Sequence, residues 1–218
     1  MRYIERGFAM PNADEANDEG IVGFTTELSL ERVMEAYPKG IFPWYEEGEP
    51  VIWWSPDPRF VLLPAELKVS KSMRKVMRDE VFDFSINAAF EQVVENCRNI
   101  KRANQNGTWI TDEVCGAYYE MYRAGYAMSV EVWYDKELVG GFYGVWVGKV
   151  FCGESMFARM SNASKAGLIW FVQRMGDNLK LIDCQVYTEH FQSLGAQMIP
   201  RNLFLQILAT QRFAPKEL

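Results

Sequence analysis

A carboxylate and an amide stand two residues apart in the apolar run 181–186, which reads Leu-Ile-Asp-Cys-Gln-Val. The run predicts a strand. Because side chains alternate across a strand, Asp183 and Gln185 are expected on one face with Leu181, while Cys184 points to the other. Such a pair could orient a nucleophile and assist its proton removal, or it could be a hydrogen-bonded pair with a structural role only. The spacing leaves both interpretations open.

A second pair of polar residues follows a glycine in the run 151–157, Phe-Cys-Gly-Glu-Ser-Met-Phe. Glu154 and Ser155 beside Gly153 are typical of a strand end at which the backbone approaches a ligand closely, since glycine leaves room there. A solvated glutamate at an ordinary strand end gives the same pattern. The motif is therefore open to two interpretations, a ligand-binding site or an ordinary strand end without a function.

A thiol nucleophile with a histidine base is a third candidate, formed by Cys184 and the single histidine, His190. The expected orientation of Cys184, away from Asp183 and Gln185, disfavours it. Four cysteines stand singly, without the paired spacing of a zinc site or a disulfide framework: Cys97, Cys115, Cys152 and Cys184. We expect no metal site, and reduced thiols that pack as small apolar side chains.

Aromatic and basic residues indicate how the chain could contact nucleic acid. Three of the seven tryptophans, Trp44, Trp53 and Trp54, lie in a proline-rich stretch and offer flat surfaces for stacking on a base. Five basic residues follow one another without an intervening acid: Lys68, Lys71, Arg74, Lys75 and Arg78. Buried tryptophans and a solvated helix face explain the same residues, so the combination favours nucleic acid only weakly.

Composition and charge bound the class of protein. The 218 residues are 49% hydrophobic and 24% charged, with a net charge of -6, which is typical of a globular chain. Much of the acid lies in residues 1–50, which hold 4 basic and 11 acidic residues, so a basic cluster elsewhere can still attract phosphates. The apolar runs are far shorter than the roughly 20 residues of a membrane helix, and the N-terminus lacks a signal-peptide pattern, so neither a membrane-spanning nor a conventionally secreted protein is expected.

The hydrophobic pattern places these residues on helices and strands in mixed order. Helix caps are expected at Ser29, Ser70, Asn87 and Thr111. Further helices are expected over 162–175 and from Pro200, and strands over 60–63, 82–86, 128–134, 138–147, 150–155 and 180–186. The three strands in close order predict an antiparallel meander. The result is a mixed α/β order with an antiparallel core sheet, in one domain or one domain with a small lobe.

Five long words of the sequence resemble the signature blocks of the leucyl/phenylalanyl-tRNA–protein transferase family, in the family's order, between about residues 29 and 201. They are Gly40-Ile-Phe-Pro-Trp44, Trp53-Trp-Ser-Pro-Asp-Pro-Arg59, Gly107-Thr-Trp-Ile110, Phe151-Cys-Gly-Glu-Ser-Met-Phe157 and Leu181-Ile-Asp-Cys-Gln185, with Ser193-Leu-Gly-Ala196 as a further match. Consecutive words of this length are far more specific than one short motif.

The resemblance implies a bacterial, cytoplasmic enzyme. Its members move leucine or phenylalanine, and less often methionine, from aminoacyl-tRNA to the N-terminal arginine or lysine of a protein, which marks the product for N-degron degradation. It implies an α+β fold with a small N-terminal α/β lobe, here residues 1–62, and a larger GNAT-like (N-acetyltransferase-like) domain with a mostly antiparallel mixed sheet, here residues 63–218. It also implies a monomer that uses no metal, no coenzyme A or other cofactor, and no membrane.

The resemblance also implies roles for the polar residues. Gln185 would orient the attacking amine, with Asp183 beside it assisting proton removal, a form of help worth about 10²–10⁴ in rate. Alternatively, the ribose hydroxyl shuttles the proton, and both side chains only position groups. Glu154 would pair with the basic side chain of the acceptor.

Binding roles are implied in the same way. Trp44 and Trp109 would hold the terminal adenosine. The donor side chain would lie in an apolar pocket formed by Phe142, Phe151, Met156 and Leu168, beside Gly153 and Ser155. The five basic residues Lys68, Lys71, Arg74, Lys75 and Arg78 would meet tRNA phosphates.

Two departures from the family pattern bear on detail. Thr25 and Thr26 stand where paired glycines are usual, and Glu27 stands in place of an aspartate. Phe142 stands where methionine is expected, which could narrow the pocket and shift donor preference away from phenylalanine.

Three rival functions fit parts of the same pattern. An acyl-coenzyme A transferase of the same fold would need a glycine-rich pyrophosphate loop, which is not visible in the sequence. A tRNA-dependent transferase that supplies peptidoglycan precursors would be a much longer chain. A catalytically inactive tRNA- or peptide-binding module of the same fold would show salt-dependent binding without turnover.

Overall fold

The chain builds two β-sheets in the computed structural model, which describes residues 2–100 and 108–216. The smaller sheet is antiparallel, in the order β1-β3-β2: β1 (Ile21–Thr25), β2 (Phe42–Pro43) and β3 (Val51–Trp54). The larger sheet has the order β10-β4-β9-β8-β7-β6-β5: β4 (Arg59–Leu62), β5 (Asp83–Ile86), β6 (Ala127–Tyr134), β7 (Glu137–Val147), β8 (Val150–Ala158), β9 (Leu181–Gln185) and β10 (Gln197–Ile199).

The larger sheet is mixed but mostly antiparallel. Of its described strand pairs, β8 and β9 run parallel and the others antiparallel. The predicted α+β fold with a small N-terminal sheet and an antiparallel meander is therefore confirmed. β4 is the last strand of the predicted lobe 1–62, but it pairs with β9 and β10 and so belongs to the larger sheet. The division of the chain at residue 62 stays a prediction.

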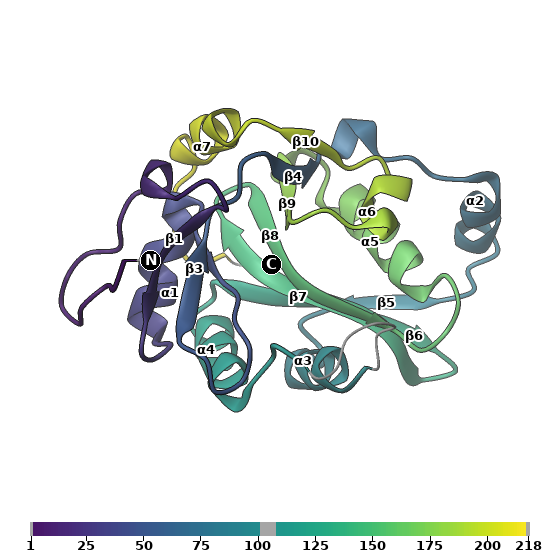
Figure 1. Cartoon of the computed structure of the whole chain (residues 1–218). Coiled ribbons are helices and arrows are strands. Elements are labelled where there is room, and N and C mark those ends of the chain that lie inside the picture. The colour runs from purple at the N-terminus through teal and green to yellow at the C-terminus, as the bar shows by residue number, and fades with distance from the viewer. Residues whose placement is uncertain (1, 101–107, 217–218) are drawn as a thin grey trace.

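Helices cover both faces of the larger sheet (Figure 1). The α-helices of the described residues are α1 (Leu30–Ala36), α2 (Lys71–Arg78), α3 (Phe90–Asn99), α4 (Asp112–Arg123), α5 (Ala163–Met175), α6 (Glu189–Ser193) and α7 (Arg201–Ala209). Of these, α3, α4 and α5 pack on the strands of the larger sheet, whereas α1 packs on α4 and β2, and α2 on α5. Neighbouring strand residues point to opposite faces: Phe142 and Phe151 pack with Phe171 of α5, whereas Tyr143 and Cys152 pack in the core that contains α3 and α4. Within the described ranges, no helix has the length and apolar character to cross a bilayer.

Three of the four predicted helix caps are confirmed. The hydroxyls of Ser29, Ser70 and Thr111 accept hydrogen bonds from backbone N–H groups at 3.2–3.3 Å, at the starts of α1, α2 and α4. The prediction at Asn87 is wrong. This residue has a left-handed backbone, with φ 59°, and its side chain accepts from the N–H of Ser129.

A buried glutamate takes over at the start of α3. The Glu131 carboxylate, on β6, accepts from the N–H groups of Ala88 and Ala89 at 3.3 and 3.4 Å and from the Ser85 and Ser129 hydroxyls. These bonds fix the residues that lead into α3, and a carboxylate close to a helix N-terminus is favoured by the helix dipole. Local sequence could not indicate this, because the acceptor comes from more than 40 residues away.

The three strands of the smaller sheet, β1, β2 and β3, were not predicted, and neither were two short elements near the C-terminus, α6 and β10. The last two lie between β9 and α7, where the sequence shows neither a helical nor an alternating period. β10 pairs with β4 at the edge of the larger sheet, so its strand conformation comes from that pairing.

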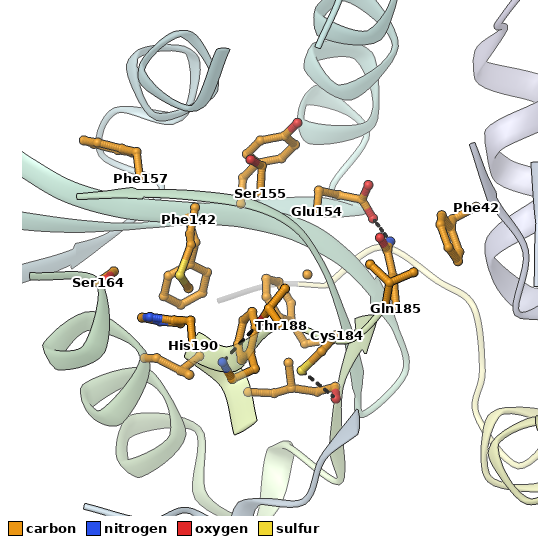
Figure 2. A pocket seen from close by; sticks show the side chains of 18 of the residues that line it. Phe42, Phe142, Glu154, Ser155, Phe157, Ser164, Cys184, Gln185, Thr188 and His190 are labelled. Atoms are coloured by element: carbon orange, nitrogen blue, oxygen red, sulfur yellow. Dashed lines mark hydrogen bonds between the residues drawn. The ribbon is translucent and has the colours of Figure 1, made fainter. Parts of the chain in front are cut away.

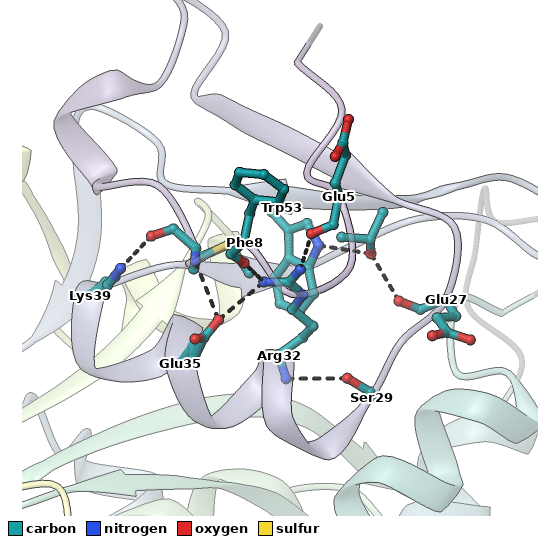
Figure 3. A network of polar contacts seen from close by, with 10 residues as sticks. Glu5, Phe8, Glu27, Ser29, Arg32, Glu35, Lys39 and Trp53 are labelled. Carbon is teal, nitrogen blue, oxygen red and sulfur yellow. Dashed lines mark hydrogen bonds and ion pairs between the residues drawn. The ribbon is translucent and has the colours of Figure 1, made fainter.

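The N-terminal arm is tied to α1 by an arginine that is 8% exposed (Figure 3). Arg32 donates to the carbonyls of Glu5 and Phe8 and ion-pairs with Glu35 at 3.2 Å. Nearby, the Lys39 ammonium donates to the Met10 carbonyl. These bonds satisfy arm carbonyls that have no partner strand.

One of the divergent residues, Thr25 at the end of β1, has a structural explanation. The Thr25 hydroxyl donates to the Glu27 carbonyl at 2.9 Å and accepts from the indole N–H of Trp53 at 3.1 Å. Thr25 is buried, and its hydrogen bond to Trp53 links the end of β1 to β3, so this residue helps to fix the smaller sheet.

Candidate active site

One cavity of about 420 Å³ gathers most of the predicted site residues (Figure 2). The predicted residues that line it are Trp44, Trp109, Phe142, Phe151, Gly153, Glu154, Ser155, Met156, Leu168 and Gln185. They come from β7, β8, β9, α5 and two loops. Asp183 and the five basic residues do not line it.

Most of the cavity wall is apolar. Phe142 on β7 and Phe151 on β8 meet edge to face with ring centroids 5.9 Å apart, and Leu168 of α5 packs in the same core cluster. Met156 is half-buried beside them. A Cβ added at Gly153 would lie 3.7 Å from the nearest protein atom, so the surrounding protein does not require glycine and the space there opens to the cavity. The wall suits an unbranched or branched apolar side chain.

A carboxyl–amide pair forms a polar part of the cavity wall. The Gln185 side-chain amide donates to Glu154 Oε1 at 2.8 Å. The Tyr37 hydroxyl donates to the same oxygen at 2.6 Å, and the Tyr118 hydroxyl donates to Oε2 at 2.7 Å. Burial raises the pKa of Glu154 to about 7, against the lowering effect of the tyrosine hydrogen bonds.

The tyrosines and Glu154 form a ring of three short contacts, completed by 2.6 Å between the Tyr37 and Tyr118 hydroxyls. Burial raises the pKa of both tyrosines, so each keeps its proton. Two phenol protons cannot fill three contacts. When Glu154 is protonated, its own proton can fill one of them, and one tyrosine hydroxyl then accepts from Glu154 and donates to the other tyrosine. When Glu154 is ionised, its Oε2 keeps one acceptor position free.

Sequence reasoning missed Tyr37 and Tyr118. Tyr37 follows α1, and Tyr118 lies on an apolar face of α4, where an aromatic residue predicts core packing. A weak indication was present, because a tyrosine at a predicted core position needs a hydrogen-bond partner for its hydroxyl and so points to a polar group nearby.

Asp183 is fully buried and engaged by an arginine that was not predicted as a site residue. Arg59 on β4 donates from Nε to Oδ1 at 2.8 Å and from Nη2 to Oδ2 at 2.7 Å. Oδ1 also accepts from the backbone N–H of Gln185 at 3.0 Å. Asp183 therefore contacts Gln185 from behind the cavity wall.

The expected alternation along β9 is wrong at its end. Gln185 has φ 63°, and the β4–β9 register slips by one residue at this point. This bulge turns Gln185 so that it lines the cavity together with Cys184, which was expected to face away from it.

The thiol–histidine pair finds no support, although Cys184 and His190 both line the cavity. Burial raises the pKa of the Cys184 thiol well above its ordinary value, and its Sγ donates weakly to the Ile182 carbonyl. His190 Nε2 is buried and has no hydrogen-bond partner among the described residues. Among the described residues, no group of three or more histidine, cysteine, aspartate or glutamate side chains is arranged so that it could hold a metal ion.

Two tryptophans stand on the cavity wall. Trp44, 42% exposed, packs on Trp54 with centroids 5.8 Å apart, and its carbonyl accepts from the Trp54 indole at 2.7 Å. Trp109 is half-buried. Gly107, in the same sequence word, lies outside the described residues.

The five basic residues are exposed, on α2 and just before it. Met73 points inward from this helix, and Arg78 ion-pairs with Asp79 at 3.2 Å. α2 packs against α5, the helix that carries Leu168 of the cavity wall. The basic residues themselves are exposed and do not line the cavity.

An apolar cavity with a carboxyl–amide pair in its wall can hold an apolar group beside an oriented amine. This arrangement fits an enzyme that transfers an acyl group to an amine.

Comparisons with known proteins give the family. The family model of "Leucyl/phenylalanyl-tRNA protein transferase" matches residues 61–209, and that of its N-terminal domain matches residues 26–57. Similar proteins named leucyl/phenylalanyl-tRNA–protein transferase occur in Flavobacterium johnsoniae, 48% identical over 97% of this chain and 100% of that protein, and in Christiangramia forsetii, 50% identical over 95% and 100%. One from Yersinia enterocolitica is 47% identical over 96% and 89%. The chain therefore belongs to the leucyl/phenylalanyl-tRNA–protein transferase family.

Solved structures with related chain paths include N-acetyltransferases. A GCN5-related N-acetyltransferase from Kribbella flavida covers 76% of this chain and 58% of its own, at 9% identity and a TM-score of 0.37. A ribosomal-protein-alanine N-acetyltransferase from Brucella melitensis covers 63% and 98%, at 10% identity and a TM-score of 0.36.

Proposed function

We propose that this enzyme transfers leucine or phenylalanine, and less often methionine, from aminoacyl-tRNA to the N-terminal arginine or lysine of acceptor proteins. The observation that carries the proposal is the apolar cavity with Glu154 and Gln185 in its wall. The donor side chain would occupy the apolar part, lined by Phe142, Phe151, Met156 and Leu168 and flanked by Gly153 and Ser155. Such a pocket discriminates by size, at roughly 1–3 kcal/mol per methylene.

Glu154 explains the preference for a basic acceptor. It is an acidic side chain that lines the cavity, and when ionised its Oε2 keeps one acceptor position for an incoming guanidinium or ammonium. A cation also favours the ionised form of a carboxyl whose pKa is raised by burial.

Gln185 is proposed to orient the attacking amine. Its Nε2 is held by Glu154, so its Oε1 is left to accept a hydrogen bond from the amine. The neutral amine attacks the ester carbonyl, a C–N bond forms, the C–O bond to the ribose breaks, and the amine proton passes to the leaving ribose oxygen. Because both oxygens of Asp183 are engaged by Arg59 and Oδ1 also by the Gln185 N–H, the positioning role of Asp183 is better supported than proton removal.

Trp44 and Trp109 are proposed to stack with the terminal adenosine, since both stand on the cavity wall and Trp44 keeps an exposed ring. We further propose that the reaction takes place in the cytoplasm, by a monomer with residues 1–62 and 63–218 as its two units and without metal or cofactor, and that its products enter the N-degron pathway.

The proposal is tested by incubating the enzyme with leucyl-tRNA carrying labelled leucine and a peptide that begins with arginine. Label is expected on this peptide and not on a matched peptide that begins with aspartate. Salt-dependent tRNA binding, with no transfer from leucyl-, phenylalanyl- or methionyl-tRNA, would instead identify an inactive binding module.

The basic face of α2 and Lys68 is proposed to contact tRNA phosphates. Replacing Lys71 and Arg74 together by glutamine should flatten the dependence of log K on log salt by roughly 1–2 units, because each lost phosphate contact removes one counterion-release step. Binding is measured by fluorescence titration of tRNA at several salt concentrations. The matched control replaces Arg123 and Lys180, which are exposed elsewhere. Equal slopes in both variants would exclude α2 from the interface.

A further inference from the structure

Arg59 holds Asp183 in the geometry of two parallel hydrogen bonds. The arginine is 1% exposed and the aspartate 0%, and the two bonds measure 2.8 and 2.7 Å. Two parallel bonds fix the plane of a carboxylate as well as its distance, which a single bond does not. The orientation of Asp183 is therefore set by β4, the neighbouring strand.

Arg59 is in turn fixed between two aromatic rings. Its guanidinium carbon lies 4.7 Å from the ring centre of Phe42 and 4.6 Å from that of Phe204. Phe42 belongs to the small sheet and lines the cavity, and Phe204 belongs to α7 near the C-terminus. Segments from both ends of the chain thus hold one side chain in place.

Asp183, held in this orientation, in turn contacts the backbone of Gln185. Its Oδ1 accepts from the Gln185 backbone N–H at 3.0 Å, at a residue with φ 63°. A left-handed backbone is unfavourable for glutamine and persists only where the surroundings hold it. The β-bulge that aims Gln185 at the cavity is held by this hydrogen bond.

We propose that Arg59 is a positioning residue of the active site, which acts through Asp183 to hold the backbone of Gln185 in its left-handed conformation. The inference rests on the proposed function, in which Gln185 orients the acceptor amine. Arg59 itself does not line the cavity, so its proposed effect on the reaction is exerted through Asp183.

A purely stabilising role explains the arrangement less well. A buried ion pair is commonly no more stable than an apolar pair of similar volume. Arg59 Nη1 is moreover buried without a hydrogen-bond partner among the described residues, which destabilises the folded state. An apolar pair would lack an acceptor for the Gln185 N–H, whereas Asp183 Oδ1 accepts from it while it also accepts from Arg59.

Two variants test the proposal. Arg59→Lys keeps the charge but loses the two-bond geometry. Arg59→Met combined with Asp183→Leu replaces the pair by apolar side chains, so no unpaired charge is buried. We expect kcat for leucine transfer to fall about 10–100-fold in both, because displacing a reacting group by about 1 Å has effects of this size. KM for leucyl-tRNA should stay within about threefold, because contacts to the tRNA are unchanged.

A second readout does not depend on activity. Amide hydrogen exchange of Gln185, followed by NMR, should be slow in the unmodified enzyme and at least about tenfold faster in both variants, because the acceptor of its N–H is displaced or absent. The matched control is Arg32→Lys, a buried arginine of α1 that contacts the N-terminal arm. It should leave kcat and the Gln185 exchange rate unchanged.

The outcomes separate this proposal from the proposed function. An unmodified enzyme that transfers no amino acid contradicts the proposed function, whereas the exchange of Gln185 still tests the positioning. A rapidly exchanging Gln185 amide in the unmodified enzyme overturns the inference. So does a folded Arg59→Met, Asp183→Leu enzyme whose kcat is within about threefold of normal. If Arg59→Lys does not fold, the apolar pair and the unmodified enzyme decide the question.

Discussion

Gln185→Ala should lower kcat for leucine transfer to an arginine peptide by about 10²–10³-fold. Its side-chain amide is held at 2.8 Å by Glu154 and lines the cavity, so its loss leaves the attacking amine without an orienting acceptor. KM for leucyl-tRNA should change little, because the tRNA contacts proposed above are made by other side chains. Steady-state kinetics with each substrate varied in turn will separate the two constants.

A matched control uses another glutamine. Gln192 is exposed on α6, where it accepts from the Tyr187 hydroxyl, and Gln192→Ala should leave kcat unchanged. Gln185→Gly adds a useful comparison, because glycine adopts the left-handed backbone without strain and removes only the side chain. A folded Gln185→Ala or Gln185→Gly enzyme with normal kcat would show that the amine is oriented by another group.

Glu154→Gln should lower kcat/KM for an arginine peptide by about 10–100-fold. The change removes the charge that would pair with the acceptor but keeps the size of the side chain, and a hydrogen bond to a charged group contributes about 1.5–3 kcal/mol. The loss should appear in the acceptor KM, because the pairing holds the bound acceptor before reaction. Competition between arginine and leucine peptides measures the change in preference directly.

The same carboxyl predicts a pH dependence. Burial raises the pKa of Glu154 to about 7, so in the free enzyme it is mostly protonated below that pH and mostly ionised above it. Acceptor affinity should therefore rise as pH increases through about 7, and this rise should be absent in Glu154→Gln. The acceptor's own α-amine titrates in both enzymes, so only the difference between the two profiles reports on Glu154.

Two results would contradict the assignment of Glu154. One is a Glu154→Gln enzyme that keeps both its preference for arginine and its pH profile. The other is a carboxyl signal of Glu154, followed by NMR, that titrates near pH 4 in the free enzyme. Either would place the acceptor's cation on another part of the molecule.

Local sequence predicted the elements well where one segment carries the whole signal. The caps at Ser29, Ser70 and Thr111 and the meander of β6, β7 and β8 follow from side chains that act on their own neighbours. The prediction failed at Asn87, because Glu131 of another strand supplies the acceptors for the start of α3. It also missed β10, whose conformation depends on pairing with β4.

The candidate site divides in the same way. Glu154 and Gln185 were identified from single words of sequence, and the structure brings them to 2.8 Å across β8 and β9. Tyr37, Tyr118 and Arg59 contact these words from positions 36 to 124 residues away, and no local pattern marks them as site residues. Their partners became visible only once the strands and helices were assembled.

By itself, the sequence determined the residue types of the chemistry and the family to which the chain belongs, because both lie in contiguous words. Only the tertiary structure decided what state those residues are in. Burial raises the pKa of Glu154 to about 7 against the lowering effect of hydrogen bonds from two tyrosines. Arg59 and a β-bulge place Asp183 behind the cavity wall and Gln185 in it. The physical reason is that desolvation, ion pairing and backbone conformation at a residue depend on everything packed around it, and here those neighbours come from both ends of the chain.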